Sequence, residues 1–395
     1  MLGRLPWRRH ARHHPHEHEA MMSGHDDLLA RTAGQWWRHD ETHAVVAVAQ
    51  VRELVMAAYA AGGATHEDAE YLAQGHLDKA LQGDHARGLG SLRRVLQGVR
   101  AGEIDLRPAL STVTDWPAAA IIDAPPSAIP DLVCRHGMVV AIEKAEVHGA
   151  SWVGVRASGG ALHRVVRQAV DRDIVGLAMT QSPPFVAPLG GYGPLLGNGP
   201  LAVGVPSRRH DPVILDMAST RTSASGVAVH AAAHRSVPPG LLLDREGYPT
   251  TDAAQLFNGG SLVPIGGHKG YALLFVISLL ASVMTDTSFP WELFAGSPEP
   301  KRHGTLLIAL NPLVVMPLDT FTDRVDAFID HVKAAPRRPD TEEILYPGEL
   351  SQRLRRERSQ RGEMAIPASA LSDLVAVARE LGLPEPVVRA ELPHP

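Results

Sequence analysis

The stretch MTQSPPFVAPLGG, at residues 179–191, decides the fold together with LLGNGP at residues 195–200 and VILDMA at residues 213–218. Each is an apolar, strand-like run that ends in small, turning or polar residues. In α/β proteins such ends present backbone donors to a ligand. We therefore expect the middle of the chain to supply strands whose ends line a binding cleft.

The segments around these runs alternate between strand and helix patterns. Apolar strand patterns at 118–122, 152–155 and 175–180 are separated by helix patterns at 132–148 and 162–172. This alternation predicts an α/β sheet. The other expected elements are strands at 201–205, 213–215 and 306–310, and helices at 45–61, 65–81 (where Thr65 and Asp68 resemble a capping box), 92–100, 267–284, 321–334 and 367–381.

The composition excludes several classes of protein. The 395 residues suffice for two lobes, and 45% hydrophobic with 21% charged residues is ordinary for a soluble globular chain. A net charge of -5 gives no reason to expect a nucleic-acid partner. The single cysteine, Cys134, rules out an intrachain disulfide and fits a reducing, cytoplasmic location. The longest apolar stretch, residues 271–284, is read as a buried helix, so no membrane span is expected.

The chain carries no dinucleotide fingerprint of the Rossmann type. The segment GYGPLLG, at residues 191–197, has one residue too many for GxGxxG, and Pro194 stands where the phosphate-binding helix should begin. No GxxxxGK[ST] motif is present either, and after the Arg/His-rich residues 1–40 no group of histidines and carboxylates has metal-ligand spacing. A bound dinucleotide must therefore be held in another way, and no metal is expected.

Many short segments resemble, in order, the malate/L-lactate dehydrogenase family, of which the chain would be a divergent member. Besides the three runs above they are residues 100–104, 141–149, 155–156, 244–252, 267–271 (GHKGY) and 346–349 (YPGE), and the likeness covers about residues 45–382. This family has a non-Rossmann α/β fold with a mixed sheet and flanking helices. It is usually dimeric and binds NAD or NADP in extended form, so the resemblance implies a homodimeric oxidoreductase with a small-molecule substrate.

The chain is expected to divide into four parts, the first from its composition and the others from the resemblance. Residues 1–40 are expected to be a disordered Arg/His-rich tail, or an over-extended start with Met21 or Met22 as the true one. Residues 41–115 would be the helical segment of a substrate and dimer lobe, and residues 116–305 the cofactor-binding α/β domain. Residues 306–395 would return to the first lobe.

Carried over by position, the family's cofactor contacts fall on Ser158, Thr180, Val213, Ile214, Leu215, Asp216, Met217, Ala218, His268, Lys269, Gly348 and Glu349. Lys269 stands between glycines at an expected helix start, where a cation and free backbone N–H groups can hold a pyrophosphate. A solvated surface lysine is the alternative. Asp216 ends an apolar strand and could orient a catalytic base or a ribose hydroxyl, or merely cap a turn.

The family's catalytic residues are not where the resemblance predicts them. Members that reduce 2-oxo acids carry Ser-His-Gly, with an arginine four residues after the histidine that grips the substrate carboxylate. Here Arg87 stands in place of that histidine and Ser91 in place of that arginine. A second histidine expected after residues 155–156 is also missing.

Three interpretations of these departures remain open. In the first, the roles have migrated, so that His85 donates the proton and Arg87 binds the acid group. In the second, the protein uses nicotinamide on another substrate, such as a cyclic imine, which needs less acid assistance. In the third, redox activity is lost and the scaffold is a non-redox enzyme or a binding protein. His163, at an expected helix start, is a spare candidate base or else a solvated cap residue.

Several charged residues are read without a catalytic role. Arg156, Arg208 and Arg209 are candidate partners of a 2′-phosphate, which would distinguish NADP from NAD. The residues read as solvated surface charges are Arg353, Arg355, Arg356, Arg358, Asp323, Asp326 and Asp330. The sequence thus predicts a cytoplasmic NAD(P)-dependent oxidoreductase acting on a small 2-oxo or 2-hydroxy acid or a cyclic imino acid, with His85, Arg87 and Asp216 as catalytic residues.

Overall fold

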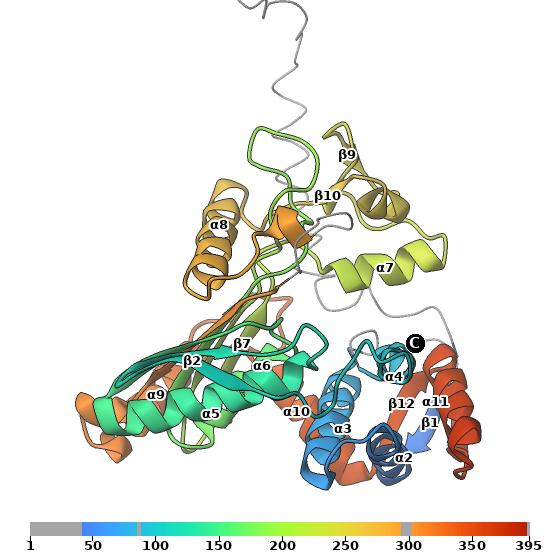
Figure 1. Ribbon diagram of the computed structural model, residues 1–395, viewed down its shortest axis with the longest axis horizontal. Helices are drawn as coiled ribbons and strands as arrows, with labels where there is room; N and C mark the ends of the chain where they lie inside the picture. Colours follow the sequence, from blue (N-terminus) through green and yellow to red (C-terminus); the bar gives the residue numbers. More distant parts are fainter. Residues whose placement is uncertain (1–41, 85–87, 294–301, 393–395) are drawn as a thin grey trace, which may run out of the picture. The chain divides into compact units, whose positions relative to one another are not determined.

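A mixed seven-stranded sheet forms the centre of the computed structural model, which describes residues 42–84, 88–293 and 302–392 (Figure 1). The strand order is β2-β3-β4-β11-β5-β6-β7. The predicted α/β class, with a mixed sheet and flanking helices, is confirmed. The strands are β2 (Ser111–Trp116), β3 (Ala119–Asp123), β4 (Ala150–Val155), β5 (Val175–Thr180), β6 (Leu201–Val205), β7 (Val213–Met217) and β11 (Thr305–Leu310).

One edge of this sheet collects the carboxyl ends of four strands. β3 and β4 run parallel, β11 is antiparallel to both β4 and β5, and β6 is antiparallel to both β5 and β7. Consequently β3, β4, β5 and β7 share one direction. Thr305 pairs with both Val155 and Thr180, which places the ends of β4 and β5 on either side of β11. Open α/β sheets bind ligands at such an edge.

Different helices cover the two faces of the sheet. Ala178 and Leu307 are buried in the core beneath α5 and α6, whereas Met179 and Leu306 belong to a cluster with Ile277 of α8. Successive residues of a strand point to opposite faces, so neighbouring residues of β5 and β11 serve the two cores. These helices are α5 (Pro130–His148), α6 (Leu162–Val170) and α8 (His268–Val283).

The expectation of a wholly buried helix at residues 271–284 is wrong. α8 buries Leu274, Ile277 and Ala281, but its outer face is exposed. The helix is apolar on every side, so periodicity could not separate the buried face from the outer one. The exposed apolar side chains are Leu273, Phe275, Val276, Leu279, Val283 and Met284.

The last part of the chain returns to the first strand. β1 (His43–Ala47) pairs antiparallel with β12 (Glu363–Pro367) and β13 (Val388–Leu392). Residues 45–47 therefore belong to a strand rather than to the expected helix, because distant segments supply their hydrogen-bond partners. Asp68 N donates to Thr65 Oγ1 at 3.1 Å, which confirms the predicted helix cap. The helices around this sheet are α2 (Val48–Ala61), α3 (His66–Leu81), α4 (Leu92–Arg100) and α11 (Ala368–Leu381).

A third, small sheet and three further α-helices complete the described sheets and α-helices. A small sheet has the strand order β10-β8-β9. Within the described residues, no helix combines the length and the apolar character needed to cross a membrane. The remaining strands and longer helices are β8 (Leu242–Leu243), β9 (Pro249–Thr250), β10 (Ser261–Leu262), α7 (Ala224–Ala232), α9 (Leu318–Lys333) and α10 (Glu349–Arg361).

Candidate functional site

Three side chains from three separate elements meet at the carboxyl end of β7. The Asp216 carboxylate oxygen Oδ2 lies 3.2 Å from Lys79 Nζ and 3.4 Å from His163 Nδ1. The side chains of Lys79 and His163 are only 10% and 12% exposed, and that of Asp216 is 21% exposed. We call Lys79, His163 and Asp216 the Asp216 cluster.

The local structure explains why these residues converge. Asp216 follows Ile214 at the strand period of two, and Ile214 packs against the core on the α5 and α6 face of the sheet. His163 is the second residue of α6, which packs on β7, and Lys79 lies in the last turn of α3. His163 is therefore buried, and the alternative of a solvated cap residue is wrong.

Burial dominates the electrostatics of the imidazole. Burial lowers the pKa of His163, the neighbouring Lys79 ammonium lowers it further, and the Asp216 carboxylate opposes both effects. The imidazole is therefore neutral near pH 7. Its Nε2 atom is buried and has no hydrogen-bond partner among the described residues. A buried, unpaired polar atom of this kind is unusual and points to a functional role.

The neighbouring Asp78 anchors the end of α3 that carries Lys79. The buried Asp78 lies 2.7 Å from Arg355 Nε and 3.7 Å from Arg164 Nε, and Arg358 Nη1 donates to the carbonyl of Leu81 at 2.7 Å. Arg355 and Arg358 thus attach α10 to α3, and the expectation that they are merely solvated is wrong. Two charged residues, Asp78 and Lys79, inside an otherwise apolar helix turn were the sequence signal for this site, and sequence reasoning missed it.

The start of α8 is tied to the residues that follow β7. Ile265 N donates to Ser219 O at 3.1 Å, just before two glycines, Gly266 and Gly267, with φ of 54° and 61°. Such φ values favour glycine, so the backbone turns sharply into the helix. The side chains of His268 and Lys269 are exposed and make no hydrogen bond or ion pair within the described residues. They remain available to an anionic ligand.

Two other predicted contacts have their polar groups engaged inside the protein. Thr180, at the end of β5, is 6% exposed, and its hydroxyl forms a 2.7 Å hydrogen bond with that of Thr305. Ser158 is half-buried, and its carbonyl accepts a hydrogen bond from Cys134 Sγ at 3.3 Å. The Thr180 hydroxyl therefore joins β5 to β11.

The Gly348–Glu349 turn lies against the first part of β7. Ile214 N donates to Pro347 O at 3.1 Å, and a Cβ on Gly348, whose φ is 86°, would stand 2.6 Å from Ile214 O. Only glycine fits there without a backbone shift. The Glu349 carboxylate accepts hydrogen bonds from Lys333 Nζ and from Tyr346 N.

The remaining candidates are dispersed. His85 and Arg87 lie outside the described residues. Arg156 donates to the carbonyl of Thr285 at 3.1 Å and to Asp286 at 2.9 Å, away from β7. The structure therefore brings Asp216 together with His163, and the Gly348–Glu349 turn with the start of β7. The predicted residues Val213, Leu215 and Met217 lie in β7 at the outer edge of the sheet, where β7 pairs only with β6, and Ala218 follows the strand.

Known proteins share both this sequence and this architecture. The profile of the malate/L-lactate dehydrogenase family matches residues 46–375. An L-sulfolactate dehydrogenase from Methanothermobacter thermautotrophicus is 33% identical over 80% of this chain and 91% of its own. A Delta(1)-pyrroline-2-carboxylate/Delta(1)-piperideine-2-carboxylate reductase from Pseudomonas syringae is 31% identical over 69% of this chain and 81% of its own. The solved malate dehydrogenase of Pyrococcus horikoshii aligns with a TM-score of 0.77 and 25% identity, over 87% of this chain and 97% of its own.

These matches confirm the predicted fold, because they cover the described sheets and the helices around them. They also confirm the predicted class of enzyme, since the relatives are dehydrogenases and reductases. The chain belongs to the malate/L-lactate dehydrogenase family and is an enzyme of the dehydrogenase and reductase class.

Proposed function

We propose that the protein is an NAD(P)-dependent oxidoreductase that moves a hydride between nicotinamide and a small 2-oxo or 2-hydroxy acid, or a cyclic imino acid. The names of its relatives support this range, because they include malate and sulfolactate dehydrogenases and reductases of cyclic imino acids. All of these compounds are small carboxylic acids with a reducible carbon beside the carboxyl group. A cytoplasmic location fits the free, buried Cys134.

The Asp216 cluster is the observation that carries this proposal. Reduction of a carbonyl requires one proton in addition to the hydride, and a side chain positioned by a partner usually supplies it. Asp216 is the most exposed of the three side chains, and its Oδ2 lies 3.2 Å from Lys79 Nζ and 3.4 Å from His163 Nδ1. We assign Asp216 to orient the reacting group and Lys79 and His163 to position the carboxylate. His85 as proton donor and Arg87 as binder of the substrate's acid group remain predictions.

The residues around β7 fit an extended dinucleotide. β7 is an edge strand, and the exposed Lys269 stands beside two left-handed glycines at the start of α8. The ammonium of Lys269 and the first N–H groups of α8 would hold the pyrophosphate. When bound, the nicotinamide supplies or accepts the hydride, and the protein contributes orientation and charge placement.

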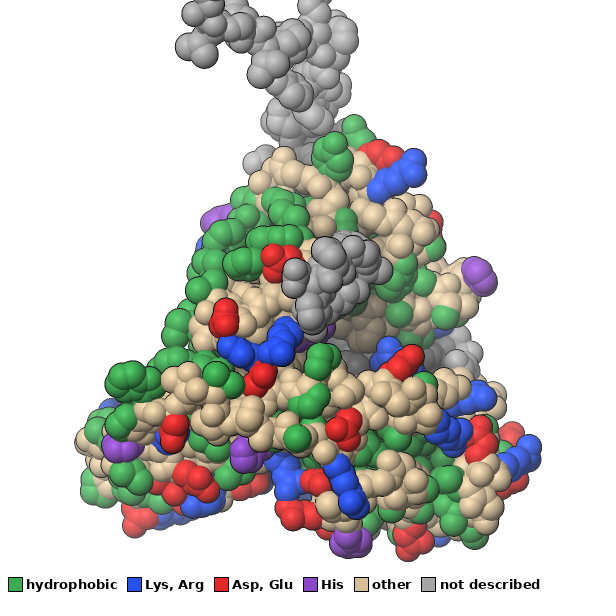
Figure 2. Space-filling view, viewed as in Figure 1, with side chains coloured by type: hydrophobic (Ala, Val, Ile, Leu, Met, Phe, Trp, Pro, Cys, Tyr) green, Lys and Arg blue, Asp and Glu red, His purple; other side chains and the backbone are tan. Residues whose placement is uncertain are grey.

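The exposed apolar face of α8 supports a homodimer. Figure 2 shows apolar side chains gathered over this helix. The exposed apolar residues of α8 include Phe275, Val276 and Val283. A continuous apolar surface of this kind is usually covered by a partner. We propose that a second copy of the chain covers it. Light scattering should give the mass of a dimer for the wild type and that of a monomer for Val276→Asp.

Binding and turnover test the proposed function separately. NADH and NADPH are titrated into the purified full-length protein while their fluorescence is followed, and 2-oxo acids and cyclic imines are then screened with the coenzyme that binds. We expect binding of at least one coenzyme and oxidation of it by a member of one of the two substrate classes. Absence of binding of both coenzymes would contradict the proposal and favour a non-redox role for this fold.

A further inference from the structure

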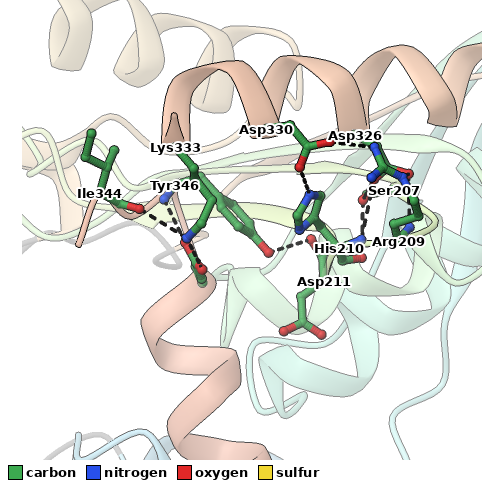
Figure 3. A network of polar contacts seen from close by, with 10 residues as sticks. Ser207, Arg209, His210, Asp211, Asp326, Asp330, Lys333, Ile344 and Tyr346 are labelled. Atoms are coloured by element: carbon green, nitrogen blue, oxygen red, sulfur yellow. Dashed lines mark hydrogen bonds and ion pairs between the residues drawn. The ribbon is translucent and has the colours of Figure 1, made fainter. Parts of the chain in front are cut away.

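An arginine-lined cleft of about 420 Å³ opens at the amino end of β7, opposite to the end that carries Asp216. Its walls come from the loop before β7, from the segment before α10, and from the first turns of α10. Figure 3 shows much of this region from close by. We call it the arginine cleft, and its lining residues are Arg208, Arg209, His210, Asp211, Tyr346, Glu349, Arg353 and Arg356.

The loop that presents two of these arginines is held by a buried carboxylate. Asp326 of α9 accepts hydrogen bonds from Ser207 Oγ at 2.6 Å and from Arg209 N at 3.0 Å, and its side chain is fully buried. The expectation that Asp326 is a surface residue is therefore wrong. Tyr346 Oη donates to Asp211 O at 3.0 Å from the other wall (Figure 3). The backbone of the cleft is thus fixed before any ligand arrives.

Two of the four guanidinium groups, those of Arg208 and Arg353, are paired in ways that a ligand can displace. Arg208 pairs with Asp319, and Arg353 with Glu343, and in each pair both side chains are at least one third exposed. Exposed pairs of this kind contribute little to stability, so exchanging a carboxylate for a phosphate costs little. Arginine also keeps unused N–H donors, because each guanidinium has five. The lining as a whole carries four guanidinium groups and two carboxylates.

The two carboxylates are committed to other partners. Both oxygens of Asp211 accept hydrogen bonds from Arg356 Nη1, at 2.7 and 2.5 Å. Glu349 is held by Lys333 Nζ and Tyr346 N. An acidic side chain that receives the ribose 2′-hydroxyl is typical of NAD sites, whereas a nearby arginine accommodates the 2′-phosphate of NADP. The cleft offers the second arrangement.

We propose that the arginine cleft binds the 2′-phosphate of the coenzyme, so that the enzyme prefers NADP(H) to NAD(H). The inference rests on the proposed function. A dinucleotide that lies extended along β7 with its nicotinamide at Asp216 brings its adenosine to the opposite end of the strand, where the cleft opens. The Gly348–Glu349 turn, which the family likeness assigns to the coenzyme, forms part of the same wall.

The test measures dissociation constants of NADPH and NADH for the wild type, Arg208→Met and Arg353→Met. Each pocket variant should weaken NADPH by roughly 10- to 100-fold, because a charge-assisted hydrogen bond to the phosphate is lost. NADH affinity should change by less than about threefold, since exposed pairs alone contribute little. Displacement of NADPH by 2′,5′-ADP, but not by 5′-AMP, should report the phosphate directly.

Arg361→Met is the matched control, because Arg361 lies at the end of the same helix and outside the cleft. It should leave both affinities unchanged, and circular dichroism confirms that each variant is folded. Equal affinity of the wild type for NADPH and NADH, or equal losses for both in the variants, would overturn the inference and leave the proposed function intact. Binding of neither coenzyme would overturn both.

Discussion

Two aspartates near opposite ends of β7 have carboxylates with very different polar partners. Asp326 is fully buried and accepts hydrogen bonds from Ser207 Oγ and two backbone N–H groups of the neighbouring loop. Asp216 is partly exposed, and its Oδ2 is shared by Lys79 and His163 at 3.2 and 3.4 Å. Well-satisfied buried carboxylates stabilise a fold, whereas a carboxylate beside an imidazole with an unpaired nitrogen is poised for chemistry.

The comparison predicts different consequences for losing a structural carboxylate and for losing one at the candidate site. Loss of Asp326 should loosen the loop before β7 and reduce stability. Loss of Asp216 should mainly reduce turnover. The following changes test whether loss of each residue affects stability or turnover as expected.

Asp216→Asn should cause the largest effect. The amide keeps an oxygen that Lys79 can contact, but it removes the negative charge with which Asp216 is assigned to orient the reacting group. We expect kcat to fall by roughly 10²- to 10⁴-fold, the usual contribution of a positioned acid or base. Steady-state kinetics with the coenzyme and substrate found in the screen measure this, and thermal melting serves as the control. Near-normal kcat in a folded variant would remove Asp216 from the mechanism.

Asp326→Asn should show the opposite pattern. Its hydrogen bonds from Ser207 and the backbone would be made to a neutral acceptor or lost, at a cost of about 3 kcal/mol in the free energy of unfolding. The kcat of the remaining folded protein should stay within a factor of about two, because Asp326 touches neither β7 nor the Asp216 cluster. Urea unfolding monitored by circular dichroism gives the stability. An unchanged midpoint would show that the loop is held by other contacts.

The dependence of stability on pH in the acidic range should also test the structural role of Asp326. Burial by itself raises the pKa of Asp326, but the hydrogen bonds from Ser207, Arg209, His210 and Arg208 outweigh it and lower the pKa. Its contribution is therefore present above the unfolded value of about 3.9 and is lost as the pH falls through the folded value. The stability of the wild type should drop more steeply below about pH 4 than that of Asp326→Asn. Parallel curves would contradict this assignment.

His163 should give the smallest effect. Its lowered pKa means that the unfolded chain takes up the proton first, near pH 6.5, so its contribution is present above that pH and declines below it. His163→Gln should remove this component, a difference of about 1 kcal/mol in the pH dependence between pH 7.5 and 5.5. The kcat–pH profile of the variant should also shift. A variant that changes stability uniformly and leaves the profile unmoved would indicate a purely structural imidazole.

Much of the sheet was predictable from the sequence, and the site was predictable only in part. Strands 175–180 and 201–205 match their expected bounds because each is a short apolar run closed by turn residues. Asp216 was found because it ends such a run. Lys79 was not singled out and His163 was only a spare candidate base, because their proximity to Asp216 depends on how α6 packs on β7 and on where α3 ends. Asp326 was misread because its helix has polar neighbours on most sides and its buried face is set by a distant loop.

A crystal structure of the protein with bound NADPH tests the central claim most directly. The account predicts an extended dinucleotide along the outer edge of β7, with the nicotinamide at Asp216, the pyrophosphate beside Lys269 and the 2′-phosphate in the arginine cleft. A dinucleotide bound elsewhere, or one whose nicotinamide lies remote from Asp216, would contradict it.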